Sequence, residues 1–358
     1  MRYLPLLLAL LTACGDDDSP TDIGPDDRDQ VDFAVDTAED APEDTAPPED
    51  ATPDDAPADA MDAADEALDA PMDAGPPIDP IDGAEEVTFV VGQYMGEDFG
   101  FLEGPHWVDG RLWFTDQFFG RPDRTAVYAL TEAGAVDIIV QPSDGANGLG
   151  TNAAGDVIAC LQAGRRIARI EPDSITTLFE RFDGSRLNAP NDLVFREDGR
   201  WYFTDPGYGS EGAAELDTRA VYLVDDDTLT QVWRGSLEQR PNGIMLSPDE
   251  SVLYLADTAD GLVRAFDVEP DGTLTGERTF ANVPGPDGLT IDEAGNLYVT
   301  TNSGVEAFAP DGTRWGALEV PMRAANATFG GADRRTLYIT ARTAVYSVRM
   351  PIAGIEGR

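Results

Sequence analysis

The sequence contains no lysine, a single histidine and two cysteines among its 358 residues. Without lysine, neither a Schiff base nor a lysine general base can form. The single histidine, His106, excludes any mechanism that needs a pair of histidines and any zinc site built from three of them. No stretch shows sustained helical periodicity, so the pattern favours an all-β fold.

Basic residues are also few, since 24 arginines face 68 acidic residues and the net charge is -44. This acidity argues against nucleic acid as a partner, because phosphate would be repelled. Much of the charge lies in residues 15–85, a stretch rich in Asp, Ala, Pro, Glu and Thr. Such a segment cannot bury enough apolar surface to offset its ordering entropy, so we predict a disordered linker there.

Residues 1–14 are typical of a lipoprotein signal peptide. A short positively charged start precedes an apolar run that is too short to span a bilayer of ~30 Å. The ending LTAC, at residues 11–14, resembles the bacterial lipobox, at which cleavage exposes Cys14 for lipidation. An ordinary signal peptide with an incidental cysteine is the alternative. We expect a lipid anchor at Cys14 in a bacterial membrane and a place in the cell envelope, periplasmic or surface-facing.

Six copies of one pattern fill residues 86–358. Each copy has a leading polar residue, often followed by Gly, then an apolar strand, a turn and a strand of β-branched and aromatic residues. The leading residues recur every ~39 to 51 positions, the period of a propeller blade. They are Glu103, Asn147, Asn191, Asn242, Asp287 and Asn326. Two further strands follow in each copy, and residues 87–91 supply the last outer strand, which predicts a monomeric six-bladed β-propeller with four antiparallel strands per blade.

The first strand of each blade lines the channel of a propeller, so the leading residues form a ring of side-chain oxygens. Two carboxylates with several amides suit Ca²⁺ or another hard divalent cation, with Zn²⁺, Mg²⁺ and Mn²⁺ as alternatives. Asn-Gly and Asp-Gly alone would indicate hairpin turns, but here they precede the first strand of a blade. The predicted metal ligands are Glu103, Asn191, Asn242 and Asp287. Asn147 and Asn326 are expected either to contact substrate or to cap a strand.

From about residue 92 to 354 the chain resembles the gluconolactonase and regucalcin (senescence marker protein) family of six-bladed propellers. The segments that carry the resemblance include LNAPND (187–192), RPNG (240–243) and PDG (286–288). The resemblance implies that the metal glutamate, asparagine and aspartate of the family are Glu103, Asn242 and Asp287, and that Asn191 contacts the metal or the substrate. Gln162 departs from bacterial members, which often carry a histidine near this point.

These features predict a metal-dependent hydrolase that opens a lactone, such as gluconolactone, or a similar ester. The cation would polarise the carbonyl and activate water, and Asp287, or in second place Glu103, would accept the proton. The expected contacts to the small-molecule substrate are Asn147, Arg165, Asn188, Asn191 and Asn326. Two alternatives stay open: a non-catalytic propeller with structural calcium that binds a ligand or scaffolds proteins, and an aryl esterase or organophosphate hydrolase on the same metal site.

Overall fold

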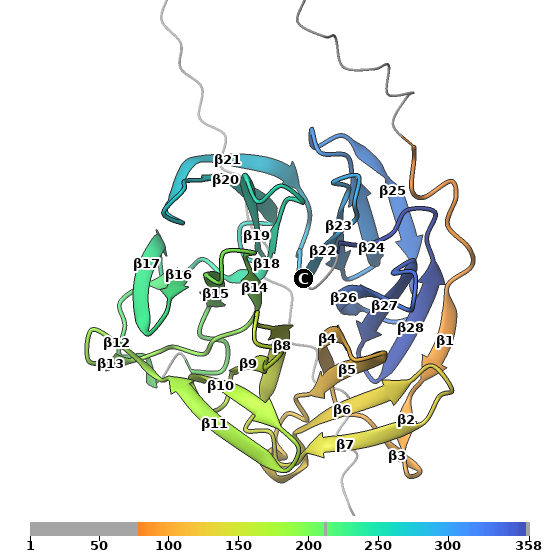
Figure 1. The fold of residues 1–358 in the computed structure, drawn as a ribbon, viewed down its shortest axis with the longest axis horizontal. Helices are drawn as coiled ribbons and strands as arrows, with labels where there is room; N and C mark the ends of the chain where they lie inside the picture. Colours follow the sequence, from red (N-terminus) through yellow and green to blue (C-terminus); the bar gives the residue numbers. More distant parts are fainter. Residues whose placement is uncertain (1–77, 211–212, 356–358) are drawn as a thin grey trace, which may run out of the picture. The chain divides into compact units, whose positions relative to one another are not determined.

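Six four-stranded antiparallel sheets surround a central axis in the computed structural model (Figure 1). The structure describes residues 78–210 and 213–355, which belong to one compact unit of the chain. The predicted all-β, six-bladed propeller with four strands per blade is therefore confirmed. The predicted signal peptide, Cys14 and most of the predicted linker lie outside the described residues and stay predictions.

The first three blades follow the chain outward from the axis. Blade one contains β4 (Leu102–Val108), β5 (Arg111–Asp116), β6 (Ala126–Thr131) and β7 (Val136–Val140). Blade two contains β8 (Ala146–Thr151), β9 (Val157–Leu161), β10 (Arg166–Glu171) and β11 (Ser174–Phe179). Blade three contains β14 (Leu193–Phe195), β15 (Trp201–Asp205), β16 (Arg219–Asp225) and β17 (Thr228–Gly235).

The remaining blades repeat this order and include the closing strand. Blade four contains β18 (Pro241–Leu246), β19 (Val252–Asp257), β20 (Leu262–Val268) and β21 (Leu274–Asn282). Blade five contains β22 (Leu289–Ile291), β23 (Leu297–Thr301), β24 (Gly304–Phe308) and β25 (Arg314–Glu319). Blade six contains β26 (Ala324–Gly330), β27 (Thr336–Ala341), β28 (Ala344–Arg349) and β1 (Thr88–Val91). Two short hairpins, β2 (Gln93–Tyr94) with β3 (Glu97–Asp98) and β12 (Arg181–Phe182) with β13 (Ser185–Arg186), lie outside the blades.

The ring is closed by hydrogen bonds between strands from the two ends of the described chain. Strand β1 pairs antiparallel with β28, with Thr88 opposite Ser347. The outermost strand predicted for the last blade is therefore confirmed. Ile81 and Ala84, which precede the predicted start of the propeller at residue 86, already pack against the hydrophobic cluster of blades five and six.

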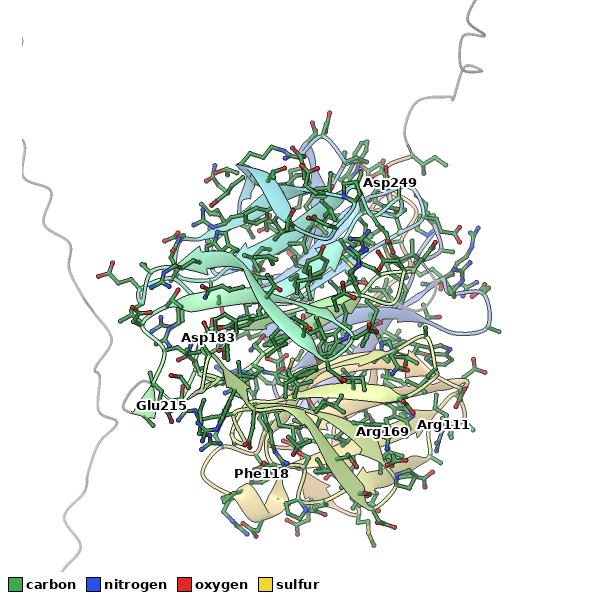
Figure 2. The ribbon with its side chains drawn as sticks, turned by 60° about the vertical axis from the view of Figure 1, so that its left-hand side comes forward. Arg111, Phe118, Arg169, Asp183, Glu215 and Asp249 are labelled. Carbon is green, nitrogen blue, oxygen red and sulfur yellow. The ribbon has the colours of Figure 1, made fainter. Side chains whose placement is uncertain are left out.

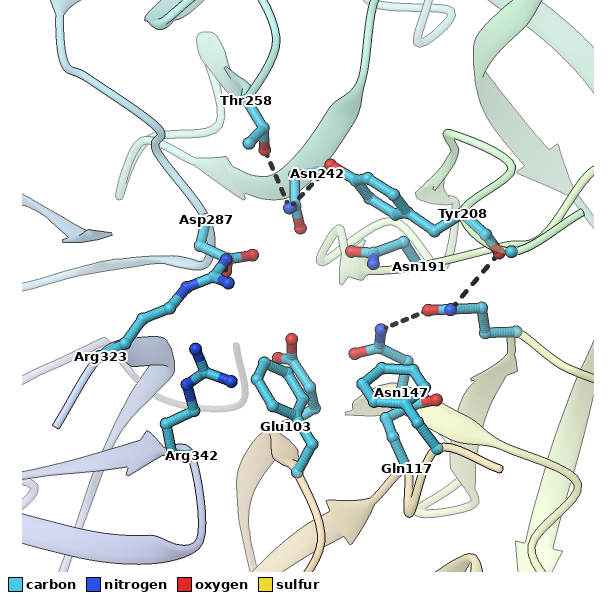
Figure 3. Close-up of a pocket in the computed structure, with 14 residues that line it drawn as sticks. Glu103, Gln117, Asn147, Asn191, Tyr208, Asn242, Thr258, Asp287, Arg323 and Arg342 are labelled. Atoms are coloured by element: carbon cyan, nitrogen blue, oxygen red, sulfur yellow. Dashed lines mark hydrogen bonds and ion pairs between the residues drawn. The ribbon is translucent and has the colours of Figure 1, made fainter. Parts of the chain in front are cut away.

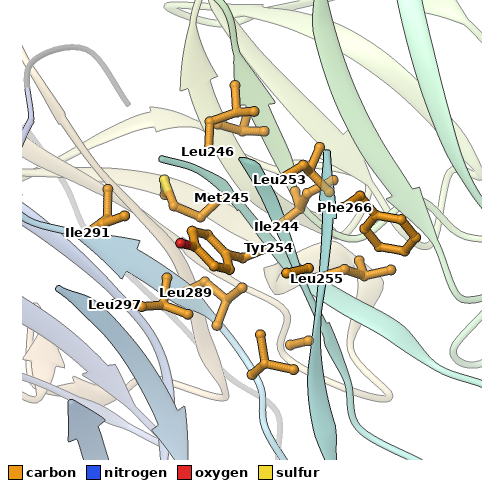
Figure 4. Close-up of a cluster of buried hydrophobic side chains, with 14 of the residues drawn as sticks. Ile244, Met245, Leu246, Leu253, Tyr254, Leu255, Phe266, Leu289, Ile291 and Leu297 are labelled. Carbon is orange, nitrogen blue, oxygen red and sulfur yellow. The ribbon is translucent and has the colours of Figure 1, made fainter. Parts of the chain in front are cut away.

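Each sheet is covered by a neighbouring sheet on both faces, which explains why the inner strands are nearly continuous apolar runs. Ile244 and Leu255 of blade four are 1% and 0% exposed, and they share a cluster with Leu289 and Leu297 of blade five (Figure 4). Burial of this apolar surface is the main favourable contribution to folding. Cys160 is equally buried, as expected for a small hydrophobe, and burial raises the pKa of its thiol.

Charged side chains cover the outside of the propeller (Figure 2). Arg111 pairs with Asp137 at 3.4 Å, and Arg169 pairs with Glu171 at 3.5 Å. Pairs with this much exposure contribute little to stability, because water screens them. The described residues contain no helix long and apolar enough to cross a membrane.

Carboxylates at the ends of second strands hold the loop that leads into the same blade. Asp205 accepts hydrogen bonds from the backbone N–H groups of Asn188 at 2.8 Å and Ala189 at 2.6 Å. Asp116, at the matching place in blade one, accepts hydrogen bonds from three backbone N–H groups. These two aspartates therefore have a structural role, since each fixes the backbone of a loop.

Glycines after the leading residues allow neighbouring blades to approach closely at the axis. A Cβ on Gly243 would lie 2.4 Å from the carbonyl oxygen of Asp287, and one on Gly288 would lie 2.2 Å from Oδ1 of Asn326. The same glycines donate N–H bonds across the blade boundary, from Gly243 to Asp287 at 3.0 Å and from Gly288 to Ala325 at 2.9 Å. These Asn-Gly and Asp-Gly pairs therefore lie at the innermost strands and form no hairpin turns.

Replacing Gly243 with alanine should destabilise the propeller, because the added methyl group meets a backbone carbonyl that has no room to move. We expect the free energy of unfolding to fall by roughly 1–3 kcal/mol, measured by urea denaturation. Gly316→Ala is the matched control, since a Cβ there meets only a methyl group of Ile81, at 3.3 Å. Equal stability of Gly243→Ala and wild type would contradict the tight contact between blades.

Candidate active site

A pocket of about 370 Å³ lies at the axis, and five of the six predicted ring residues line it (Figure 3). They are Glu103, Asn147, Asn191, Asn242 and Asp287, all between 3% and 6% exposed. The structure thus brings together all four predicted metal ligands and one predicted substrate contact. These oxygens converge from five different blades, as the spacing of the repeats predicts.

Irregular pairing and bonds between blades position the leading residues. In blades one, two and four, the register between the first two strands shifts at the leading residue, as in a β-bulge, which redirects side chains locally. The Thr115 hydroxyl donates to the carbonyl of Asn147 at 3.1 Å, and the Thr204 hydroxyl donates to that of Asn242 at 2.8 Å. The leading residues of blades two to five are therefore held through their backbone by the preceding blade, which leaves their side chains for the pocket.

A second set of residues lines the pocket from the position directly after the second strand of a blade. We call these the support positions, and they hold Gln117, Gln162, Thr258 and Arg342. Gln117 donates to the carbonyl of Ala146, next to the leading residue of blade two, at 2.8 Å. The side chain of Gln162 accepts from Nδ2 of Asn147 at 3.0 Å.

Asn242 has the most defined orientation of the ring amides. Its Nδ2 donates to the Thr258 hydroxyl at 3.0 Å and to the Tyr208 hydroxyl at 3.3 Å. Thr258 in turn donates to the carbonyl of Pro286 at 2.7 Å, so its hydroxyl is available to Asn242 as an acceptor. Because both amide protons are used in this way, Oδ1 of Asn242 is left as an acceptor for the pocket.

The two carboxylates of the pocket are buried and close enough to influence each other. Burial raises the pKa of Asp287 to about 6, although the positive charge of Arg323 opposes the shift. Burial also raises the pKa of Glu103 well above its usual value, and the charges of Asp287 and Asp192 raise it further. Arg323 donates from Nη2 to Oδ2 of Asp287 at 3.0 Å. A second positive charge near Glu103 would favour ionisation of both carboxylates.

The donor set fits a hard divalent cation. Two carboxylates and the amide oxygens of two asparagines are the ligands that Ca²⁺ prefers, whereas thiolate and imidazole are absent from the described lining of the pocket. Within residues 78–210 and 213–355, no group of three or more His, Cys, Asp and Glu side chains could hold a metal. A cation at this site therefore depends on the amides of Asn191 and Asn242 as well as on the carboxylates.

Asn326 does not line the pocket, which corrects the predicted register of the sixth copy. In blades two to five the carbonyl of the leading residue accepts a bond from the preceding blade, and in blade six the carbonyl of Ala325 does so. Ala325 is therefore the true leading residue, and Asn326 occupies the position of the following glycine. A shift of one residue turns a strand side chain to the opposite side. Asn326 accordingly lines a separate cavity of about 30 Å³.

Two other predicted substrate contacts also lie outside the pocket, because their polar groups are engaged with the backbone. Asn188 is 0% exposed, and its Nδ2 donates to the carbonyl of Thr218 at 2.9 Å. Arg165 donates to the carbonyls of Leu187, Asn188 and Ala213 at 2.8 to 2.9 Å. Both residues support the loops of blade three, and Arg165 lines a neighbouring cavity of about 300 Å³.

His106 is likewise separate from the pocket. It is 4% exposed, its Nε2 lies 2.8 Å from the Thr151 hydroxyl, and burial lowers its pKa to about 4. The side chain is neutral at physiological pH and lines the same small cavity as Asn326. No imidazole among the described residues lines the candidate active site.

Two arginines, Arg323 and Arg342, line the pocket and were not among the predicted site residues. Arg342 occupies a support position, one residue past the second strand of the sixth copy. The sequence repeat could have identified Arg342 as a pocket residue, because the same position in three other copies holds Gln117, Gln162 and Thr258. Arg323 precedes strand β26 in a loop of variable spacing, and no pattern marks it.

The chain belongs to the SMP-30/Gluconolactonase/LRE-like family. The family pattern matches residues 101–343, which include every residue of the pocket. A gluconolactonase of Zymomonas mobilis is 28% identical over 295 residues, which are 73% of this chain and 82% of the relative. A pentonolactonase of Haloferax volcanii is 29% identical over 252 residues, covering 66% of this chain and 80% of the relative.

Solved structures agree with this assignment. A gluconolactonase of Xanthomonas campestris superposes with a TM-score of 0.67 at 31% identity, covering 74% of this chain and 89% of the other. A calcium-binding regucalcin of Agrobacterium tumefaciens superposes with a TM-score of 0.62 over 77% of this chain and 95% of the other, and at 19% identity it supports the fold alone. Family and relatives together indicate a hydrolase of the lactonase type.

Replacing Thr258 with valine should weaken cation binding, because Asn242 loses an acceptor that fixes its amide. We expect the affinity for Ca²⁺ to fall about tenfold or more, measured by calorimetric titration of metal-free protein. Thr279→Val is the matched control, on an exposed position of strand β21 in the same blade. Unchanged affinity in Thr258→Val, or no cation binding by wild type, would contradict this account of the site.

Proposed function

We propose that this protein is a divalent-cation-dependent lactonase that hydrolyses a sugar lactone. The observation that carries the proposal is the convergence of Glu103, Asn191, Asn242 and Asp287 on one buried pocket, in a chain of this family. The relatives named gluconolactonase and pentonolactonase support a sugar lactone as the substrate class. A pocket of about 370 Å³ suits a ligand of this size.

Glu103, Asn191, Asn242 and Asp287 would hold the cation, with Ca²⁺ the first candidate. When bound, such a cation supplies positive charge that polarises a carbonyl group and lowers the pKa of water. The protein prepares the site by fixing Asn242 through Thr258 and Tyr208. It also holds Asp287 through Arg323, which favours the ionised carboxylate.

The reaction adds one water across the ring ester. The oxygen of water bonds to the carbonyl carbon, and the bond between that carbon and the ring oxygen breaks. Asp287, or in second place Glu103, accepts one proton from the water and returns it to the ring oxygen, which leaves as a hydroxyl. The new carboxylic acid ionises and releases one proton to solution at neutral pH.

Substrate hydroxyls have a clear partner in Asn147. Its Nδ2 is bonded to Gln162, so its Oδ1 remains as an acceptor for the pocket. Gln162 stands where bacterial relatives often carry a histidine, and here it orients an amide. Asn191 lines the same side of the pocket and serves either the cation or the substrate (Figure 3).

An aryl ester or organophosphate is the second candidate substrate. Phe101 and Phe119 both line the pocket, and their rings lie 5.4 Å apart. An aromatic leaving group could pack against this pair. We keep a sugar lactone first, because the remaining lining is dominated by amides, hydroxyls and charged groups.

We further propose that the enzyme is a monomer anchored by lipid at Cys14 in a bacterial cell envelope. The support for the anchor comes from residues 1–14 alone, which lie outside the described part of the structure. With such an anchor, the acidic segment that follows would act as a spacer between membrane and enzyme.

Hydrolysis of D-glucono-1,5-lactone, followed with a pH indicator, tests the proposed function. We expect turnover with added Ca²⁺, loss of turnover after chelation, and a fall in kcat of about 100-fold or more in Asp287→Ala and Asn242→Ala. Thermal melting of each variant establishes that it folds. Asp271→Ala, on an exposed turn of blade four, is the control and should keep wild-type rates.

Activity that survives chelation, or that survives in folded Asp287→Ala, would contradict the metal-dependent mechanism. A panel that adds phenyl acetate and a phosphotriester separates the two substrate classes. Binding of Ca²⁺ without turnover of any compound would favour the non-catalytic propeller.

A further inference from the structure

Arg342 lines the active-site pocket from the turn between β27 and β28 (Figure 3). The backbone of the turn is fixed, because the Arg342 carbonyl accepts a bond from the N–H of Leu102 at 2.7 Å. The guanidinium carbon lies 5.9 Å from the ring centroid of Phe101. This side chain is therefore attached to a rigid turn and lies beside an aromatic wall of the pocket.

Arg342 has no hydrogen bond or ion pair from its guanidinium to any residue in 78–210 or 213–355. Every other arginine in these ranges has at least one hydrogen bond, ion pair or other interaction of this kind. In a chain with 68 acidic and 24 basic residues, carboxylate partners are abundant. The unpaired guanidinium of Arg342 therefore lies at the pocket in which a ligand is expected to bind.

The repeat explains why Arg342 has no internal partner. At the other support positions, Gln162 and Thr258 bind the side chain of the leading residue in their own blade. In blade six the leading residue is Ala325, which offers no polar side chain. The side chain at this support position consequently has no polar side chain of its own blade to bind, and it lines the pocket as an exposed guanidinium with five donors.

Arg323, the other arginine of the pocket, is already engaged. It pairs with Asp287 at 3.0 Å, and its guanidinium carbon also lies 5.9 Å from the Phe101 ring centroid. The blade-six side of the pocket is therefore aromatic and cationic, whereas Asn147 and Asn191 make the opposite side neutral (Figure 3). If the ester group of a substrate lies next to the two carboxylates, a substituent that extends toward blade six would contact Arg342.

We propose that Arg342 binds an anionic substituent, so that the preferred substrate is a sugar lactone that also carries a carboxylate, as in the monolactone of an aldaric acid. The proposal rests on the proposed lactonase function and names its substrate class. A planar carboxylate can accept two parallel N–H bonds from a guanidinium, which gives both affinity and orientation. The Phe101 ring, whose centroid lies 5.9 Å from the guanidinium carbon, would lie beside that contact.

Two lactones that differ only at carbon six provide the test. D-Glucaro-1,4-lactone carries a carboxylate there, and D-glucono-1,4-lactone carries a hydroxymethyl group. We expect wild type to show a kcat/KM at least tenfold higher for the acidic lactone, and Arg342→Asn to lower this ratio about tenfold, mainly through KM. Arg342→Lys should retain part of the preference, because it keeps the charge without the planar fork.

Asparagine is chosen to replace Arg342 because it should preserve the backbone conformation of the turn. Arg342 has a φ of +51°, in the left-handed backbone region, which asparagine adopts more readily than most residues. Arg334→Asn is the matched control, since Arg334 has a φ of +56°, pairs with Glu293 and lies away from the pocket lining. This control should leave the ratio for the two lactones at the wild-type value.

Equal kcat/KM for the two lactones in wild type, unchanged in Arg342→Asn, would overturn the anion site while leaving the lactonase intact. If neither 1,4-lactone is opened, hydrolysis of D-glucono-1,5-lactone still decides the proposed function, and calorimetric titration with the two 1,4-lactones decides the anion site. Tighter binding of the acidic lactone that is lost in Arg342→Asn would then support it. Equal binding of both lactones, or a preference that survives in Arg342→Asn, would overturn it.

Discussion

The close approach of six innermost strands around one axis is the constraint on which the rest of this structure depends. Neighbouring blades come so near that a Cβ on Gly243 or Gly288 would overlap atoms of the next blade. The same approach lets backbone N–H groups and the hydroxyls of second-strand threonines bond to the next blade's leading carbonyl. Packing, the irregular pairing of the innermost strands and the position of the site all follow from this contact.

The same constraint generates the electrostatics of the pocket. Residues forced to the axis lose contact with water, and burial raises the pKa of Asp287 and of Glu103. Two such ionised carboxylates are costly unless positive charge is near, and Arg323 supplies it through a hydrogen bond to Asp287 and a weaker effect on Glu103. The site is therefore arranged so that a cation shared by both carboxylates is favoured.

Repetition explains both what the sequence predicts and where the prediction fails. Six copies at blade spacing are enough to predict the fold, the closing strand and five pocket residues, because equivalent positions meet at one axis. The sixth copy fails by one residue, since Asn326 is the nearest polar residue to the expected place while the bonded position holds Ala325. Arg165 and Asn188 fail because their buried bonds to loop carbonyls leave no pattern in the sequence.

The leading residues are held by backbone bonds, so the fold does not require any particular side chain at these positions. Glutamate, asparagine, aspartate and alanine all occupy the ring, and the carbonyls of Asn242 and Ala325 accept equivalent threonine bonds. Side chains at the axis are consequently free to be selected for chemistry, which is how one propeller fold can serve many functions. At Asn147 and Asn242 the support position orients the amide of the ring residue, whereas at Ala325 the support position has no ring side chain to bind. If Arg342 binds an anionic substituent as proposed, blade six is the part of the ring that selects among substrates.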